Sequence, residues 1–218
     1  MTSAEQMETT RTSSEEVEVG KGGGGGDEIH PLHNEWTVWE HHQSTVSTVT
    51  SYSQNMQELY SFKTVQDFWK FWNNYPKPSD IFFDGRTKKK ITREGESQGK
   101  CINALSIFKK GIKPEWEDEQ NKNGGEWNLR KIADLSTLDK AFENLLLAMV
   151  GETLDEGNEI CGLRVLDKSK RKTCMYRIEL WIRSENAKTA IKARVHEAAS
   201  DGMPRGVSVG NLIWRGHK

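Results

Sequence analysis

The chain has 218 residues, of which 31 are basic and 32 acidic, so its formal net charge is −1. That length suits one sizeable domain. The near-zero charge excludes general adhesion to long nucleic acid through a bulk positive field, so any nucleic-acid role must rest on a local site. Eight tryptophans are candidates for such a site because indole offers a broad π face, although each also suits an ordinary core or surface position.

Cysteine usage and hydropathy place the chain among intracellular proteins without a membrane segment. Cys101, Cys161 and Cys174 form no CxxC pair, and their odd number without a secretory signal favours a reducing compartment, so we expect a cytoplasmic protein. No apolar run approaches the roughly 18 residues of a membrane span. The four histidines between residues 30 and 42 match no metal-binding spacing, so we expect no metal and no cofactor.

In chain order, residues 1–28 come first and are rich in Ser, Thr and Glu before the glycine run 22–26. Such a segment cannot bury enough apolar area to offset its chain entropy, so we expect a disordered tail followed by one domain over 29–218. The glycine run lacks the preceding strand and following helix of a phosphate-binding loop. Alternation over 35–40 predicts a strand, and the Ser/Thr-rich segment 43–53 predicts a loop.

A helix is predicted to begin after Thr64, which suits an N-cap, and to end at 73–78. Its apolar side carries Val65, Phe68, Trp69 and Trp72 at helical spacing. An insertion follows at about 79–101, either a hairpin or a long loop. Its basic run either reaches an RNA chain or is a solvated loop, and the loop is the favoured interpretation.

The second half of the chain predicts two more helices and three strands. The helices are expected from Ser136 to Gly151 and after Asn186, and the strands at 161–166, 175–182 and 207–213. Because helices interrupt runs of strands at wide intervals, we predict an α+β fold in which a sheet carries helices on one side.

The predicted strand 175–182 carries the clearest signal of a binding site. Its alternate residues Tyr176, Ile178, Leu180 and Ile182 form an apolar face. Arg177 and Trp181 share the opposite, open face, and the basic turn 168–172 lies just upstream. An aromatic surface beside clustered cations suits a base with phosphates attached. A solvated basic hairpin is the plain alternative.

The segment 111–127, with Trp-Glu-Asp-Glu at 116–119 and Asn-Lys-Asn-Gly-Gly at 121–125, resembles the signature of the eukaryotic translation initiation factor 4E family. The likeness spans about His30 to Ile213. Other matching pieces follow in order: His30-Pro31-Leu32, Thr64-Val65 leading to Phe68-Trp69, Asn144 through Gly151-Glu152, Ile160-Cys161-Gly162 and Trp181. The family binds the 7-methylguanosine cap of mRNA in the concave face of a curved antiparallel sheet backed by three helices. The resemblance therefore implies that fold, that ligand and a binding protein rather than an enzyme.

The resemblance also implies roles for individual residues. Trp116 corresponds to a stacking platform, Glu117 to the carboxylate that reads guanine, and Trp181 to the tryptophan against the N7 methyl group. Methylation at N7 makes guanine cationic, so aromatic stacking gains a cation–π component. A carboxylate that accepts from N1–H and the N2 amine selects guanine over adenine. Three basic residues match the family's phosphate ligands: Arg177, Lys168 and Lys170.

The first stacking platform departs from the main branch of the family. Tyr52 stands where most members carry Trp, and its surroundings resemble the divergent branch called the 4E homologous protein. A smaller aromatic face predicts cap affinity weaker by about 1 kcal/mol. Glu115 is a second departure, because the family usually has Met there.

The resemblance implies a partner surface on the convex side, which receives a helix with the pattern Tyr-x-x-x-x-Leu-hydrophobic from a scaffold factor or a repressor. The matching residues are His30, Pro31, Val65, Trp69, Leu147 and Gly151. We therefore expect a monomer that binds the cap and couples it to a protein partner in translation initiation or its regulation. The alternatives are a repressor of the 4E homologous protein type and an interaction module that has lost cap binding.

Overall fold

The computed structural model describes residues 28–44, 55–82, 100–132, 134–169 and 175–217. These residues build a seven-stranded antiparallel sheet in the order β2-β1-β3-β5-β6-β4-β7. The strands are β1 (Pro31–Ser44), β2 (Met56–Thr64), β3 (Lys100–Lys109), β4 (Gly125–Ile132), β5 (Ile160–Asp167), β6 (Tyr176–Ile182) and β7 (Asn211–Gly216). The helices are α1 (Val65–Asn74), α2 (Pro78–Phe82), α3 (Leu135–Val150) and α4 (Lys188–Ser200), with a 3-10 turn η3 (Glu185–Ala187) before α4.

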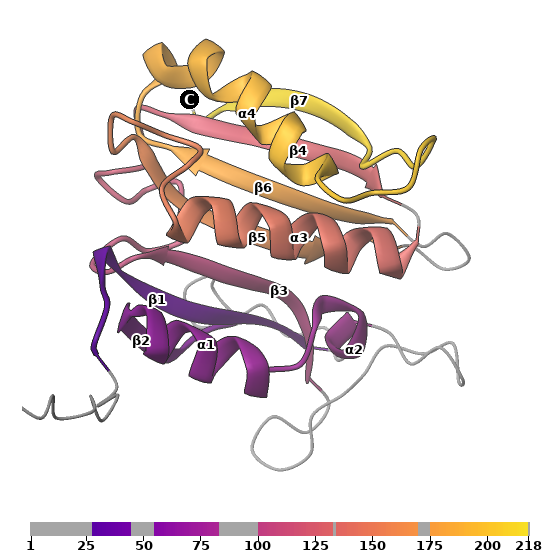
Figure 1. Cartoon of the computed structure of the whole chain (residues 1–218). Helices are drawn as coiled ribbons and strands as arrows, with labels where there is room; N and C mark the ends of the chain where they lie inside the picture. The colour runs from indigo at the N-terminus through magenta and orange to yellow at the C-terminus, as the bar shows by residue number, and fades with distance from the viewer. Residues whose placement is uncertain (1–27, 45–54, 83–99, 133, 170–174, 218) are drawn as a thin grey trace, which may run out of the picture.

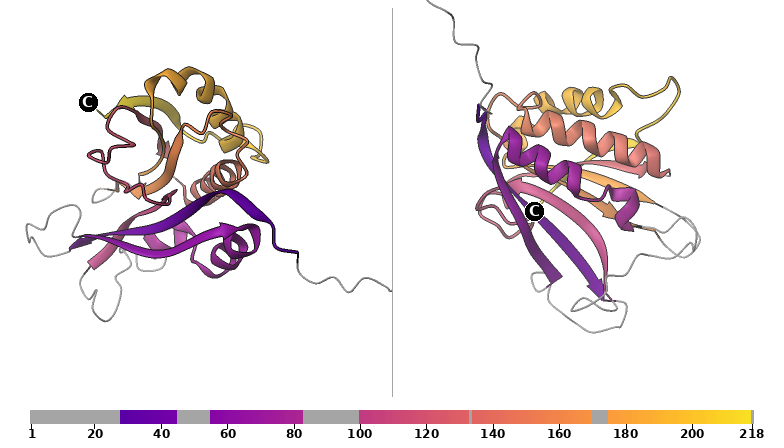
Figure 2. Two further views of the ribbon diagram at one scale, coloured as in Figure 1. Left: turned by 90° about the vertical axis from the view of Figure 1, so that its left-hand side faces the viewer. Right: turned by 60° about the horizontal axis from the view of Figure 1, so that its bottom comes forward.

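The predicted α+β class is confirmed, and the helices lie on one face of a curved sheet (Figures 1 and 2). The predicted helix number is wrong, because the described residues contain four α-helices rather than three. The addition is α2, whose Ile81 and Phe82 pack into the core beneath the helices. The start of the expected insertion is therefore helical, while residues 83–99, with the basic run, lie outside the described residues.

The helix ends follow local capping chemistry. Thr64 caps α1 as predicted: its hydroxyl accepts a hydrogen bond from the Asp67 N–H at 3.0 Å. Helix α3 begins earlier than predicted, because the Asp134 carboxylate accepts from the Thr137 N–H at 2.8 Å. It ends at Gly151 as expected, but the left-handed residue that turns the chain is Glu152, with φ of 57°.

The strands differ from the sequence prediction where long-range pairing decides their extent. Strand β1 is longer than predicted because it pairs on both sides, with β2 and β3. Strand β7 begins at Asn211 rather than at Val207, after Gly210 at φ +96°. A Cβ on Gly210 would lie 2.3 Å from the Arg130 carbonyl oxygen, so the chain joins β4 only through a glycine there.

Alternation along β6 divides its side chains between the two faces of the sheet. Tyr176, Ile178, Leu180 and Ile182 are buried in the main core with the helices. The opposite face carries a second, smaller apolar cluster made of Phe108, Ile112, Cys161 and Trp181. The Phe108 ring lies against Gly162, where a Cβ would approach it to 2.3 Å, so the glycine makes room for the ring. This second cluster supports the site described below.

Within the described part of the chain, no helix combines the length and apolar character that crossing a membrane requires.

Candidate functional site

A cavity of about 510 Å³ lies on the sheet face opposite the helices, and we call it the slot. Its walls come from the loop between β3 and β4 and from strands β5, β6 and β7. The lining residues are Pro114, Glu115, Trp116, Glu117, Arg164, Leu166, Lys168, Arg177, Glu179, Trp181 and Arg215. Segments that are distant in sequence therefore share one hollow that carries both aromatic and charged groups.

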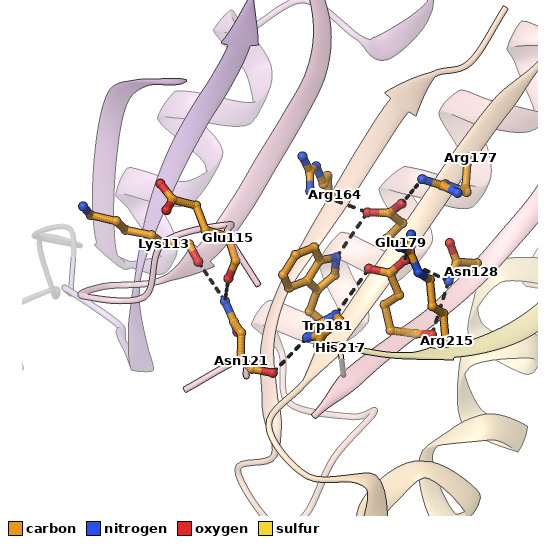
Figure 3. Close-up of polar contacts among 11 residues, drawn as sticks. Lys113, Glu115, Asn121, Asn128, Arg164, Arg177, Glu179, Trp181, Arg215 and His217 are labelled. Atoms are coloured by element: carbon orange, nitrogen blue, oxygen red, sulfur yellow. Dashed lines mark hydrogen bonds and ion pairs between the residues drawn. The ribbon is translucent and has the colours of Figure 1, made fainter. Parts of the chain in front are cut away.

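The loop between β3 and β4 presents Trp116 and Glu117 to solvent. Its anchor is Asn121, a buried residue whose side-chain N–H groups donate to the carbonyl oxygens of Lys113 and Glu115, both at 2.8 Å (Figure 3). The segment that precedes Trp116 is thus tied to Asn121, which lies four residues after Glu117. Trp116 keeps 41% of its surface exposed.

The neighbouring acid Asp118 has a structural role. Its carboxylate accepts from the N–H groups of Lys113 and Gln120, both at 2.9 Å. Glu117 and Asp118 lie in a stretch of turns rather than in a strand. Asp118 therefore belongs to the hydrogen-bonded scaffold of the loop, whereas Glu117 lines the slot.

Trp181 lies beneath the slot rather than on an open face. Its side chain is 0% exposed, and its ring is covered by the His217 ring at a centroid distance of 4.4 Å. Phe108 meets it edge-on at 5.4 Å. The indole N–H donates to Glu179 Oε2 at 3.2 Å. The predicted open position of Trp181 is therefore wrong, because the segment that follows β7 packs over it.

Glu179 organises the cations of the slot (Figure 3). Its carboxylate lies 2.5 Å from Arg177 Nη2 and 3.8 Å from Arg164 Nη1. Burial lowers the pKa of Arg164, and Glu179 opposes that effect. Lys168 stands just after β5 beside this group, where partial shielding from water and then the charge of Arg177 lower its pKa. A concentration of positive charge at this end suits an anionic group such as a phosphate.

The end of β7 supplies a second charged group that sequence reasoning missed. Buried Glu126 lies 3.9 Å from Arg215 Nη1 and 3.3 Å from His217 Nε2. The Arg215 guanidinium lies 4.2 Å from the centre of the Trp116 ring. His217 in turn lies near both tryptophans, 6.2 Å from Trp116 and 4.4 Å from Trp181 between ring centroids.

Five of the seven predicted ligand-binding residues line the slot together: Trp116, Glu117, Lys168, Arg177 and Trp181. Tyr52 and Lys170 lie outside the described residues, and their roles stay predictions. Sequence reasoning missed Arg164, Glu179, Glu126, Arg215 and His217. Alternation along 177–181 is a signal that could have found Glu179, because it puts Glu179 on the same face as Arg177, but the other four residues depend on strand neighbours. Among the residues placed by the structure, no group of three or more His, Cys, Asp or Glu side chains is arranged to hold a metal ion.

The predicted partner residues lie on the helical side. Trp69 on α1 and Leu147 on α3 are 41% and 37% exposed. The Trp72 N–H donates to Glu143 Oε1 at 3.2 Å and links these two helices. His30 lies at the start of α1, because its carbonyl oxygen accepts from the Val65 N–H at 2.8 Å.

The remaining partner residues adjoin the same helices. Pro31 pairs with Thr64 at the edge of the sheet, directly before α1, and exposed Gly151 ends α3. The predicted partner surface therefore carries one exposed aromatic side chain, on α1, and one exposed aliphatic side chain, on α3.

The model of the family described as eukaryotic initiation factor 4E matches residues 31–202. Initiation factor 4E-2 of Schizosaccharomyces pombe is 35% identical over 164 residues, 75% of this chain and 58% of that protein. Factor 4E-1 of Arabidopsis thaliana is 30% identical over 187 residues, 81% of this chain and 69% of that protein. The chain spans 59% of the length of factor 4E-1 of Solanum habrochaites, with 32% identity over 161 residues and 74% of this chain aligned.

Solved structures agree with the sequence relatives. Caenorhabditis elegans eIF4E-3, in complex with the 4E-binding protein Mextli and a cap analog, is 26% identical with a TM-score of 0.64, covering 87% of this chain and 94% of that one. Ascaris suum eIF4E-3 with an m7G cap shares the fold at 24% identity and a TM-score of 0.66, covering 88% and 93%. From the family match and these relatives, the chain belongs to the eukaryotic initiation factor 4E family.

Proposed function

We propose that this chain binds the 7-methylguanosine cap of mRNA in the slot and acts as a binding protein of translation rather than as an enzyme. The observation that carries the proposal is the convergence of an exposed tryptophan, an exposed carboxylate and a cation cluster on one cavity: Trp116, Glu117, Lys168 and Arg177. The C. elegans relative solved with a cap analog supports the ligand class. A translation factor of this kind is expected in the cytoplasm.

The chemistry of the slot matches the three parts of the cap. The Trp116 face stacks on the cationic purine, which typically contributes about 1–3 kcal/mol per base. The Glu117 carboxylate accepts from N1–H and the N2 amine, a bidentate contact that discriminates among bases by roughly 1–3 kcal/mol. Lys168 and Arg177 stand at the cationic end of the cavity, where the phosphates belong. In this proposal Tyr52 closes the other side of the purine.

Retention on a 7-methyl-GTP resin tests the proposal. We expect the full chain to bind and to elute with free 7-methyl-GTP but not with GTP. Glu117→Gln should lose at least tenfold in affinity because an amide cannot accept both guanine hydrogen bonds. Glu119→Gln is the matched control, since Glu119 lies two residues away, pairs with Lys122 at the surface and does not line the slot. If the wild-type protein is not retained on the resin, the proposal of cap binding is refuted, and the alternative of an interaction module without cap binding is supported.

We propose as a second role that the convex surface receives a partner helix of the Tyr-x-x-x-x-Leu-hydrophobic type. Exposed Trp69 and Leu147 support this role, because a docked helical peptide covers exposed apolar side chains of this kind. The C. elegans relative in complex with a 4E-binding protein supports the class of partner.

Crossed variants separate the two surfaces. Trp69→Ala should weaken binding of a Tyr-x-x-x-x-Leu-hydrophobic peptide by tenfold or more while cap-resin retention stays unchanged. Trp116→Ala should show the reverse pattern. If Trp69→Ala binds the peptide as well as wild type does, the convex surface is not the dock. Capture of a scaffold factor by the wild-type protein would assign it to initiation, and capture of repressor proteins alone would assign it to translational repression of the 4E homologous protein type.

A further inference from the structure

Arg215 lies over the aromatic ring that the proposed function assigns to ligand stacking. Its guanidinium carbon lies 4.2 Å from the centre of the Trp116 ring, and both side chains line the slot. His217, which also lies near Trp116, is not among the lining residues. Arg215 therefore lies over the Trp116 ring where both side chains border the slot.

The contact is chemically the same kind as the one proposed for the ligand. Guanidinium is a planar, delocalised cation, and it stacks on indole through cation–π attraction. A guanine methylated at N7 is also a planar cation, and it would use the same π face. Two planar cations cannot both lie within stacking distance on one face of one ring.

The remaining contacts of Arg215 hold it in place without burying it. Its side chain is 43% exposed, and its distance of 3.9 Å from Glu126 is long for an ion pair. Arg164, by contrast, is buried at 7% side-chain exposure, where leaving its partner Glu179 carries a desolvation penalty. An exposed arginine with one loose ionic partner leaves its position at low free-energy cost.

We propose that Arg215 is an internal ligand of the slot, which occupies the Trp116 face in the free protein and is displaced when the cap binds. The inference rests on the proposed function. Displacement adds the same free-energy cost to every ligand that stacks on Trp116. Arg215 therefore lowers affinity for methylated and unmethylated guanine by one common factor and leaves their ratio unchanged.

Titration of wild type and Arg215→Gln with 7-methylguanosine, 7-methyl-GDP and GDP tests this. Exposed cation–π contacts correspond to about two- to five-fold in affinity, so Arg215→Gln should bind the nucleoside about threefold more tightly. The methylated and unmethylated diphosphates should keep their affinity ratio. Arg205→Gln is the control for charge, because Arg205 is exposed and does not line the slot. An unchanged or weaker affinity of Arg215→Gln for the nucleoside would overturn the proposal.

A second measurement does not depend on cap binding. Stacking on Trp116 should shift the Arg215 Hε resonance upfield by ring current, and the signal is assigned by its loss in Arg215→Gln. Trp116→Leu should abolish the upfield shift, and 7-methyl-GDP should move the wild-type signal downfield. Absence of the upfield shift in the free wild-type protein refutes the inference. A wild-type protein that shows the shift but binds no cap analogue would instead contradict the proposed function.

Discussion

Glu179 pairs with the arginines that line the slot, and we expect this pairing to stabilise the fold. The substitution Glu179→Gln removes its charge with little change in side-chain shape. In the variant Glu179→Gln, Arg164 loses a carboxylate at 3.8 Å and Arg177 loses one at 2.5 Å. Arg164 is nearly fully buried, so its charge stays in a poorly solvated site while the opposite charge of Glu179 is removed. Removing one partner of a buried ion pair costs roughly 3–5 kcal/mol. Arg177 is 17% exposed and regains some water, so we expect the lower end, about 3 kcal/mol.

Urea unfolding followed by tryptophan fluorescence measures this loss. With a slope of about 2 kcal/mol per M, the midpoint should fall by about 1.5 M. Glu119→Gln, an exposed surface acid, should leave the midpoint within about 0.3 M. Adding Arg164→Met to Glu179→Gln should recover part of the stability, because the double variant no longer buries the Arg164 charge beside a neutral amide. A Glu179→Gln midpoint equal to that of wild type would show that the carboxylate does not neutralise Arg164.

Three further predictions follow from local chemistry. Burial, followed by the charges of Arg164, His42 and Lys168, lowers the pKa of His41 to about 4. As pH falls, His41 is protonated in the unfolded chain before it is protonated in the folded protein. The free energy of unfolding should therefore fall on the order of 1 kcal/mol as pH drops from about 6.5 to 4. In His41→Gln, the urea midpoint should change less with pH over that range. Burial raises the pKa of the Cys161 thiol to about 12, so iodoacetamide at pH 8 should label it only after unfolding, as mass spectrometry of its peptide would show; labelling of native protein would contradict its burial. Thr64→Ala removes the hydroxyl that caps α1 and should cost about 1 kcal/mol in urea unfolding, with Thr64→Ser close to wild type; equal losses in both would exclude capping as the cause.

Much of the fold is readable from periodicity, because alternation and helical spacing are local properties of the chain. The face of β6 that carries Tyr176 and Leu180 is buried as predicted. On α1, helical spacing placed Trp69 on the same side as Phe68, but Phe68 is buried and Trp69 is exposed. Strand β3 carries apolar residues at successive positions, and a strand buried on both faces lacks the alternation that identifies a half-exposed one. Strand β3 was therefore not predicted from its sequence pattern. The helix α2 was not predicted either, because its five residues are too few to show helical spacing.

By itself the sequence determined the α+β class, the helix boundary at Thr64 and several of the aromatic, acidic and basic residues that line the slot. Only the tertiary structure decided which residues complete that site. Pairing of β7 with β4 brings Arg215 and His217 beside Glu126, about 90 positions away in sequence. The same pairing covers Trp181, which alternation alone assigned to an open face. Local patterns determine which way a side chain points along its own strand, but the charge and cover it meets there come from neighbours that the chain supplies only after folding.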